Sequence, residues 1–373
     1  MHGHSTYGPT IDPVADLTPL GVAVGHATDA DGGTGCPVVR PVAGPMRGAA
    51  AVIGRATGTR ELLPLTTHHL VDRVDAILLT GGSAYGLDAA AGVMRWLEER
   101  GRGFDVGGGV VPIVPAAVIF DLAPLGRFDA RPTPEMAYAA ADAARPYDVA
   151  EGSVGAGTGA TVGKAAGPAR AMKGGFGCAT ARSGELVAAA MVVVNALGDV
   201  HDGEGRIIAG ARDDEGFADS TAILARGLPA HFADAQGEIA PVNTTLAVVA
   251  VNAAFSRADL GAVAAAASSA LFRRITPVGT AFDGDIVFAL APLEDGFADS
   301  AAMLSRGLPA HFADAQGDVA PVNTTLAVVA VNAAFSRADL GAVAASAAGA
   351  LYRRISPVGT AFDGDIVFAL APL

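Results

Sequence analysis

The sequence contains little lysine and little cysteine. Only two of its 25 basic residues, Lys164 and Lys173, are lysines, and the formal net charge is −13. Binding to nucleic acid or to an anionic membrane surface depends on a basic face, so we expect neither as a partner. Cys36 and Cys178 are the only cysteines. Two thiols in a chain of this size are typical of buried cysteines in a reducing compartment.

A targeting segment and a membrane span are also missing from the pattern. Residues 1–17 contain no basic segment followed by an apolar run. The apolar stretch 186–197 is too short and too rich in β-branched residues to cross a bilayer. We therefore expect a cytoplasmic protein. His68 and His69 have no third ligand at metal-binding spacing, so we expect neither a metal nor a cofactor.

The chain is rich in apolar residues and in glycine. It is 51% hydrophobic and its 48 glycines are interleaved with apolar runs, which favours a turn-rich fold with a large core. Short runs rich in β-branched residues predict strands buried on both faces at 74–80, 108–114, 186–194, 243–253 and 283–290. Apolar periodicity and capping residues predict helices at 86–101, at 133–146 and from Ser256 onward. The alternation is not a strict βαβ rhythm, so a layered sandwich is favoured over a barrel.

The last third of the chain is a near-copy of the segment before it. Residues 216–293 recur as 296–373 with an offset of 80, and ten of the 78 aligned positions differ. A solenoid needs about three units to bury a core, so two copies do not predict one. We interpret residues 1–293 as the working domain and 294–373 as a tandem duplicate of 214–293. Any site within the repeat is therefore present twice.

Residues 152–167 (GSVGAGTGATVGKAAG) come close to a phosphate-binding loop but fail in detail. A Walker loop requires glycine where Thr158 stands and a hydroxyl residue where Ala165 stands. The dinucleotide-binding pattern fails at Val162. We infer no nucleotide binding, and expect the segment to deliver Lys164 to a position near backbone amides.

The turn GGSAYG (81–86) joins a predicted strand to a predicted helix. Free backbone N–H groups at such a junction can bind an anion or a substrate carbonyl. A tight turn with no ligand explains the same residues equally well.

Polar residues stand at the ends of two strongly apolar strands. Asn243 and Thr244 open one of them, although pairing with neighbouring strands explains threonines there more simply. Asp283 and Asp285 precede the other and, being two residues apart, project to the same side of an extended chain. Such a pair can orient a nucleophile and its amine.

Six segments in this order resemble the DmpA-like, P1-type peptidases of peptidase family S58, a group that includes β-peptidyl aminopeptidases and nylon-oligomer hydrolases. The resemblance covers about residues 18–293 and is carried by LLTGGSAYGLDAAAGVMRWLEERG, GGGVVPIVPAAVIFDL, GAGTGATVGKA, VVVNALGDV, NTTLAVVAVNA and FDGDIVFAL. It implies an αββα four-layer sandwich of the DmpA and ornithine-acetyltransferase type, similar to N-terminal-nucleophile hydrolases. It also implies an inactive precursor that is cleaved before the nucleophile.

Carried onto this sequence, the resemblance implies cleavage between Asn243 and Thr244, with Thr244 as the N-terminal nucleophile. Asn195 matches the oxyanion-stabilising asparagine. Lys164 matches a catalytic lysine of the nylon-hydrolase branch, and Asp283 with Asp285 matches the aspartate pair found there. The expected activity is that of an aminopeptidase or amidase, which hydrolyses small peptides or amides through an acyl-enzyme, in a homo-oligomer that the family predicts to be a tetramer.

Two departures from the family pattern leave alternatives open. Some members carry a tyrosine where this chain has Phe120, and Tyr85 is a candidate for its role; Gly82, Ser83 and Tyr85 are expected to bind substrate. The second copy repeats the site as Thr324, Asp363 and Asp365. Because Lys164 and Asn195 occur once, only one complete site is expected, and Thr244 is favoured as its nucleophile. The alternatives are an uncleaved, inactive protein and an acyltransferase of the ornithine-acetyltransferase type.

Overall fold

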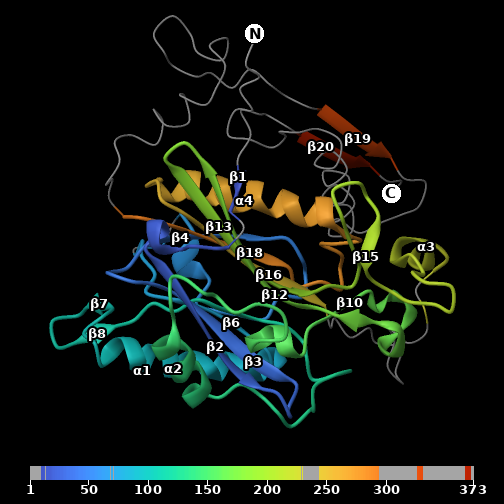
Figure 1. The fold of residues 1–373 in the computed structure, drawn as a ribbon. Helices are drawn as coiled ribbons and strands as arrows, with labels where there is room; N and C mark the ends of the chain where they lie inside the picture. Colours follow the sequence, from blue (N-terminus) through green and yellow to red (C-terminus); the bar gives the residue numbers. More distant parts are fainter. Residues whose placement is uncertain are drawn as a thin grey trace, which may run out of the picture.

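Two β-sheets lie face to face between helices in a computed structural model of the chain (Figure 1). The structure describes residues 10–12, 14–67, 69, 71–227, 229 and 243–293, together with the backbone of 326–330 and 366–370. The larger sheet contains, in spatial order, β1 (Thr10–Ile11), β12 (Gly175–Ser183), β13 (Leu186–Asn195), β16 (Thr244–Val251), β18 (Ile286–Ala291) and β4 (Arg47–Val52). The smaller contains β2 (Val22–Asp29), β3 (Thr34–Pro41), β6 (Ile77–Thr80), β9 (Ala116–Val118) and β5 (Thr59–Arg60).

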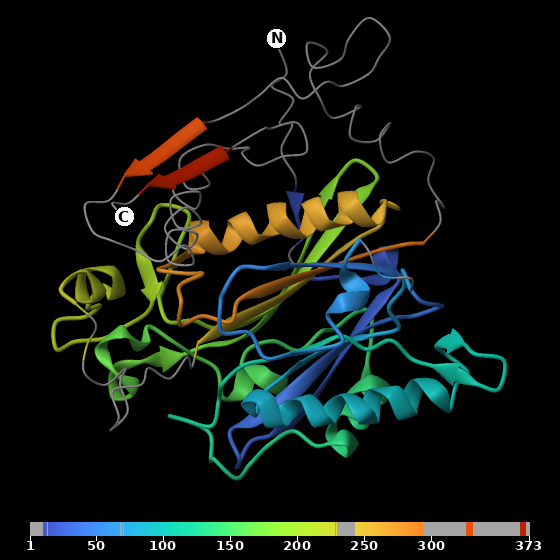
Figure 2. The ribbon, with the colours of Figure 1, turned by 180° about the vertical axis from the view of Figure 1, so that it is seen from behind.

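Helices cover the outer faces of the two sheets. Figure 2 shows α4 (Arg257–Arg274) on the larger sheet and α1 (Ala90–Glu98) with α2 (Pro134–Ala143) on the smaller one. Leu260 and Ala264 of α4 pack with outward residues of the larger sheet, and Val93 and Leu97 of α1 pack with those of the smaller sheet. The sequence of layers is therefore α, β, β, α, which confirms the expected sandwich.

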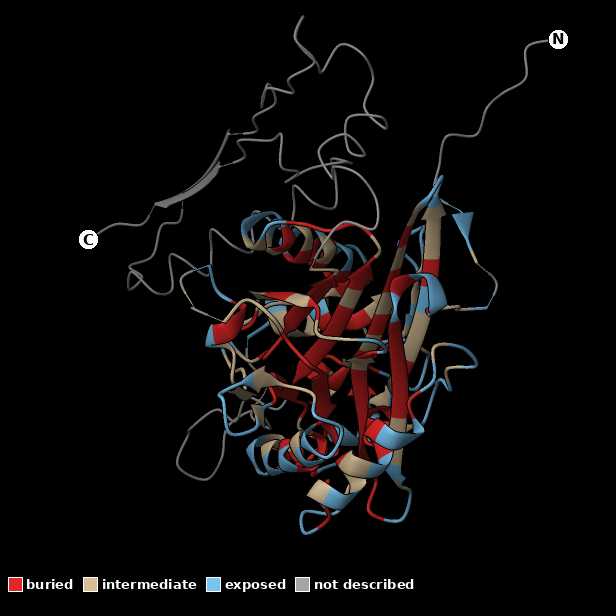
Figure 3. Cartoon of the chain, turned by 90° about the vertical axis from the view of Figure 1, so that its left-hand side faces the viewer, coloured by how far each residue is buried: buried red, intermediate tan, exposed pale blue. Residues whose placement is uncertain are grey.

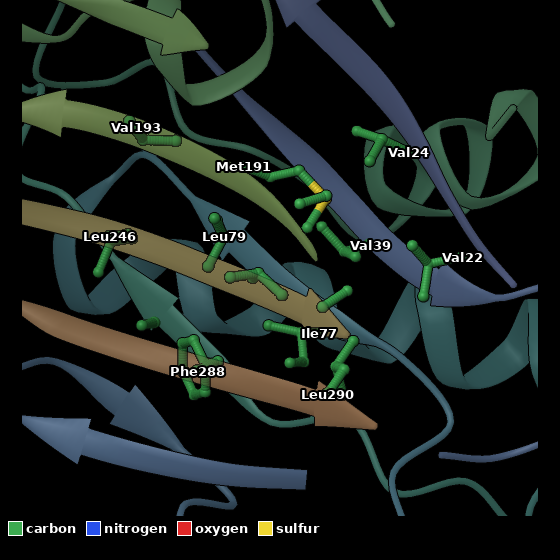
Figure 4. Close-up of a cluster of buried hydrophobic side chains, with 14 of the residues drawn as sticks. Val22, Val24, Val39, Ile77, Leu79, Met191, Val193, Leu246, Phe288 and Leu290 are labelled. Atoms are coloured by element: carbon green, nitrogen blue, oxygen red, sulfur yellow. The ribbon is translucent and has the colours of Figure 1, made fainter. Parts of the chain in front are cut away.

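The main core fills the space between the two sheets. Its members are apolar and alternate along each strand, because successive side chains of a strand point to opposite faces. Figure 4 shows Val193, Leu246 and Phe288 of the larger sheet facing Ile77 and Leu79 of the smaller one. Burial is concentrated on these central strands (Figure 3). This core fixes which strand positions point into the space between the sheets.

Shorter elements complete the described chain. They are the hairpin of β7 (Phe104–Asp105) and β8 (Val110–Val111), the pair β10 (Thr161–Val162) and β11 (Met172–Lys173), the small sheet of β14 (Asp199–His201), β15 (Ile207–Ala209) and β17 (Ile275–Thr276), and helix α3 (Ser220–Ala225). A 3-10 helix, Ser83–Ala89, leads into α1. Within the described residues, no helix is long and apolar enough to cross a membrane.

Most predicted elements are found near their predicted positions, and two burial predictions are wrong. Strands β6, β13, β16 and β18 and helices α1, α2 and α4 are confirmed. The segment 108–114 contributes only the two-residue β8 of an outlying hairpin. β13 is buried on alternate residues only, since its outward side chains pack incompletely against the clusters around α4. Both cysteines are free; Cys36 is buried and Cys178 is half-buried.

The second copy forms the same strand pair as the first. β19 (Leu326–Ala330) and β20 (Ile366–Leu370) are parallel with Leu326 opposite Ile366. In the first copy, Leu246 lies opposite Ile286 in the parallel pair β16 and β18. The register therefore matches at the sequence offset of 80. Thr324, Asp363 and Asp365 lie outside the described residues, and the division at 293/294 stays a prediction.

Candidate active site

The candidate nucleophile lies where β13 ends and β16 begins. Asn195 and Thr244 are paired residues of this antiparallel ladder, and Asn243 bridges to Asp283 in parallel. Val193 and Leu246, two residues away on each strand, point into the core between the sheets. Strand periodicity therefore directs Asn195 and Thr244 to the same side. Both are buried: Thr244 is 5% exposed and Asn195 is fully covered.

The bond between Asn243 and Thr244 is held from two directions. Thr244 Oγ1 donates a hydrogen bond of 2.6 Å to the Asn243 carbonyl oxygen, and the Gly284 backbone N–H donates one of 2.8 Å to the same atom. Gly284 is required by space, since a Cβ there would lie 2.7 Å from Thr244 Oγ1. A hydroxyl and its target carbonyl thus meet in a buried position beside Asn195.

Lys164 fixes the orientation of the Asn195 side chain. Lys164 Nζ donates to Asn195 Oδ1 and to the Asn195 backbone oxygen, both at 2.9 Å, and to the Ala196 oxygen at 3.3 Å. The Thr161 N–H also donates to Asn195 Oδ1, at 3.0 Å. Since Oδ1 is occupied by donors, Nδ2 is the end that faces away from them, and it donates to the Phe120 carbonyl at 3.2 Å. The expectation that Lys164 lies near backbone amides is wrong: the ammonium is held by carbonyl oxygens, as its three N–H groups require.

Two buried carboxyl groups complete the cluster. Asp283 Oδ2 accepts hydrogen bonds from the backbone N–H and the hydroxyl of Thr280, at 2.8 and 2.7 Å. Asp285 accepts from the backbone N–H groups of Thr245 and Gly279, at 2.5 and 3.0 Å. Each carboxyl therefore has its own loop donors, and both attract Lys164 through charge. The structure brings together all five residues that the sequence resemblance assigned to catalysis.

Burial dominates the ionisation of this cluster. It lowers the pKa of Lys164 to about 7, although Asp283 and Asp285 act in the opposite direction. Burial also raises the pKa of Asp283, and it raises that of Asp285 to about 8 with the help of the neighbouring Asp283 charge. A single cation beside two desolvated carboxyls thus favours a state in which the carboxyls do not both carry full charge. Such groups hold and exchange protons near neutral pH.

Comparison with known proteins shows where this arrangement belongs. The sequence profile of peptidase family S58 matches residues 14–318 and, separately, 294–372. The chain belongs to peptidase family S58. It is therefore a hydrolase of that family, and the second match falls on the duplicated segment.

Relatives of this S58 hydrolase cover most of its length. An uncharacterized aminopeptidase of Mycobacterium leprae (strain TN) is 43% identical over 299 residues, which are 75% of this chain and 78% of that protein. A 6-aminohexanoate-oligomer endohydrolase of Kocuria sp. (strain KY2) is 33% identical over 279 residues, 72% of each chain. The first of these relatives alone is close enough to show the family independently of the profile.

Solved structures support the fold. A Burkholderia sp. beta-aminopeptidase gives a TM-score of 0.56 at 20% identity and covers 96% of this chain and 90% of its own. The L-aminopeptidase D-Ala-esterase/amidase of Ochrobactrum anthropi, described as a variant of the Ntn hydrolase fold, gives 0.55 at 17% identity and covers 98% and 93%. These likenesses place the S58 hydrolase in the N-terminal-nucleophile type of sandwich.

The turn 81–86 lies close to the site, but its first two amides are engaged. The Gly82 N–H donates to Asp121 Oδ1 at 2.7 Å, and the Ser83 N–H donates to the Ile119 oxygen at 3.0 Å. Tyr85 is 55% exposed and its ring lies 3.6 Å from the Arg131 guanidinium. Substrate binding by Gly82, Ser83 and Tyr85 stays a prediction, with Tyr85 offering the accessible surface. Phe120 contributes to the site through its backbone carbonyl, which any residue supplies.

Sequence reasoning missed several residues that hold the catalytic groups. Thr161, Thr280, Gly279 and Gly284 act through backbone N–H groups or a short side chain. The only local signal is Thr280, three residues before Asp283, a spacing typical of side chain–backbone turns. Asp121 was also missed, although it immediately follows the Phe120 that holds Asn195. His68 lies outside the described residues, and within those described no group of three His, Cys, Asp or Glu residues could hold a metal ion.

Proposed function

We propose that this S58 hydrolase cleaves itself between Asn243 and Thr244, and that Thr244 then hydrolyses small peptides or amides through an acyl-enzyme. The observation that carries the proposal is the hydrogen bond of 2.6 Å from Thr244 Oγ1 to the carbonyl oxygen of Asn243. The hydroxyl that would attack and the carbonyl that would be attacked are already in contact. Reacting groups held in this way need little further ordering to react.

Self-cleavage would begin with attack of Thr244 Oγ1 on the Asn243 carbonyl carbon. The C–N bond breaks, the hydroxyl proton passes to the departing α-nitrogen of Thr244, and an ester links the two residues. Water then adds to the ester carbonyl, and the ester C–O bond breaks. The products are the Asn243 carboxylate and a Thr244 residue with a free hydroxyl and a free α-amine.

The free α-amine makes Thr244 a complete nucleophile and base. Its ordinary pKa of about 7.7–8.0 suits a general base near neutral pH. The amine takes the hydroxyl proton as Oγ1 attacks a substrate amide, and it returns the proton to the departing amine. Water hydrolyses the resulting Thr244 ester, which releases the acid and restores the enzyme.

Asn195 would stabilise the negative charge that develops on the substrate carbonyl oxygen. Lys164 and Thr161 occupy its Oδ1, so the amide cannot turn over and its Nδ2 hydrogens remain the donating end. One such donor contributes roughly 3–4 kcal/mol to transition-state stabilisation. Lys164 thereby acts on the reaction both by orienting Asn195 and by adding positive charge.

The carboxyls of Asp283 and Asp285 would hold the new N-terminus. Asp283 Oδ1 is buried and has no hydrogen-bond partner among the described residues, and the same is true of Asn243 Oδ1. A buried oxygen without a donor is costly, by about 1–3 kcal/mol. An α-ammonium released at Thr244 brings three N–H donors to this place, which favours the cleaved state.

The relatives define the class of substrate. Their names specify aminopeptidases and a 6-aminohexanoate-oligomer endohydrolase, all of which cleave amide bonds. We therefore propose unbranched or small-side-chain amides of amino acids as substrates, together with a homo-oligomeric state.

Processing is tested on the purified full-length chain by a denaturing gel and intact mass. Fragments 1–243 and 244–373 are expected from the wild type and not from Thr244→Ala. The matched control is Thr324→Ala, the same change in the second copy, which should process normally. A single full-length wild-type species contradicts the proposal. A fragment 324–373 shows that the second copy is competent as well.

Turnover is tested with amino-acid p-nitroanilides, with and without added acceptor amines. Release of p-nitroaniline without an acceptor, lost in Thr244→Ala, supports hydrolysis. Product formation only when an acceptor is present identifies an acyltransferase instead.

A further inference from the structure

We propose that self-cleavage and substrate hydrolysis use different oxyanion donors: the Gly284 backbone N–H for the first and the Asn195 side chain for the second. The inference rests on the proposed function and assigns Gly284 a catalytic part in maturation. It follows from the contacts of one atom, the Asn243 carbonyl oxygen, in the intact chain.

The Asn243 oxygen accepts hydrogen bonds from Thr244 Oγ1 and from the Gly284 N–H. When Oγ1 attacks, its hydrogen bond is lost and its proton passes to the Thr244 nitrogen. The Gly284 N–H remains, at 2.8 Å. This distance lies within the range of about 2.7–3.1 Å at which a donor stabilises a developing oxyanion. The carbonyl oxygen moves little as its carbon becomes tetrahedral, so the contact persists.

Burial makes this single donor effective. Gly284 and Asn243 are both buried, and hydrogen bonds to a charged oxygen are stronger where water is excluded. The N–H also needs no reorganisation, because the bridge between Asn243 and Asp283 fixes it in place. The absence of a side chain at position 284 lets the backbone approach, since a Cβ would crowd Thr244 Oγ1.

Asn195 is engaged elsewhere while the bond is intact. Its Oδ1 accepts from Lys164 and Thr161, and its Nδ2 donates to the Phe120 oxygen on the opposite sheet. None of these contacts involves the Asn243 oxygen. A substrate carbonyl that enters after cleavage approaches Thr244 from the space between the sheets, which is the side that Nδ2 faces.

Separation of the two steps tests the proposal. Asn195→Asp keeps the acceptor for Lys164 but removes the amide donor, and it is expected to self-cleave within about threefold of the wild-type rate. Its kcat on a p-nitroanilide should fall by about 10²–10³. Asn252→Asp is the matched control: its Oδ1 also accepts a backbone N–H and its Nδ2 also donates to a backbone oxygen, at the far end of the same strand pair. It should retain both activities.

A direct change of the Gly284 donor completes the test. Incorporating glycolic acid at position 284 replaces the backbone N–H by oxygen, and self-cleavage should slow by about 10²-fold. The same replacement at exposed Gly108 controls for the ester itself. Wild-type cleavage in the Gly284 ester, or an Asn195→Asp chain that stays intact while circular dichroism shows it folded, overturns the inference. A wild-type chain that never cleaves would instead refute the proposed function.

Discussion

Lys164 Nζ lies 2.9 Å from both the side-chain and the backbone oxygen of Asn195, so one ammonium fixes an asparagine at its two ends. An asparagine amide can otherwise turn over and exchange its donor and acceptor. The pair therefore determines which chemistry Asn195 can perform, and it links the two residues energetically.

Removing the Lys164 donors should reduce turnover without a large change in substrate affinity. Lys164→Met is expected to lower kcat by about 10²-fold or more with little effect on KM, because Asn195 loses its orientation. The double variant with Asn195→Ala should be little worse than Asn195→Ala alone, since both changes remove the same function. Steady-state kinetics of all four proteins measure this. Additive losses would show that the two residues act independently; Lys173→Met, the other lysine, is the control.

Enlarging Gly284 should block self-cleavage by crowding the nucleophile. In Gly284→Ala the new Cβ would lie 2.7 Å from Thr244 Oγ1 and from the Ala56 oxygen, too close for either to stay. The chain is expected to remain uncleaved on a denaturing gel over a time in which the wild type is processed. Gly261→Ala in α4, where a Cβ meets nothing within 4 Å, is the control. It should process normally, with stability unchanged or raised by up to about 1 kcal/mol.

Asp121 should make stability depend on pH. Its carboxylate accepts hydrogen bonds from Thr34 and Gly82, and burial raises its pKa from 3.8 to about 6. The stability linked to its proton is therefore present below about pH 4 and is lost as the pH rises through 6. Asp121→Asn stays neutral throughout. Relative to the parent, it should gain about 3 kcal/mol between pH 4 and pH 7.

Urea unfolding at these two pH values measures the difference, with both proteins carrying Thr244→Ala so that every chain is intact. The control is Asp129→Asn, whose exposed side chain should change stability by less than about 0.5 kcal/mol at either pH. An Asp121→Asn difference that does not vary with pH would argue against a protonated Asp121 in the fold.

Phe288 should be a principal support of the core between the sheets. It is fully buried among the residues of Figure 4, so Phe288→Ala is expected to lower the free energy of unfolding by about 3–5 kcal/mol. Phe128 is 63% exposed, and Phe128→Ala should cost less than about 0.5 kcal/mol. Denaturant titration compares the two, and equal losses would contradict the burial pattern.

Local patterns in the sequence were sufficient for most of the elements. The runs that became β13, β16 and β18 and the capped segment that became α4 are strong signals of strand and helix. The failure at 108–114 has a clear reason: an apolar run of that length is also compatible with a short outlying hairpin. The alternating burial of β13 could not be read from its continuous run of apolar residues, because incomplete cover on one face depends on distant segments.

The sequence by itself determined which residues are available for chemistry, because the ordered motifs place Thr244, Asn195, Lys164 and the aspartate pair in a recognisable succession. Only the tertiary structure decided how they act. It brings the carbonyl of Asn243 against Gly284, and Asn195 against Lys164, across separations of 41 and 31 residues. Backbone N–H and C=O groups occur at almost every position and carry no sequence signature, so their selection as catalytic partners depends on strand register alone.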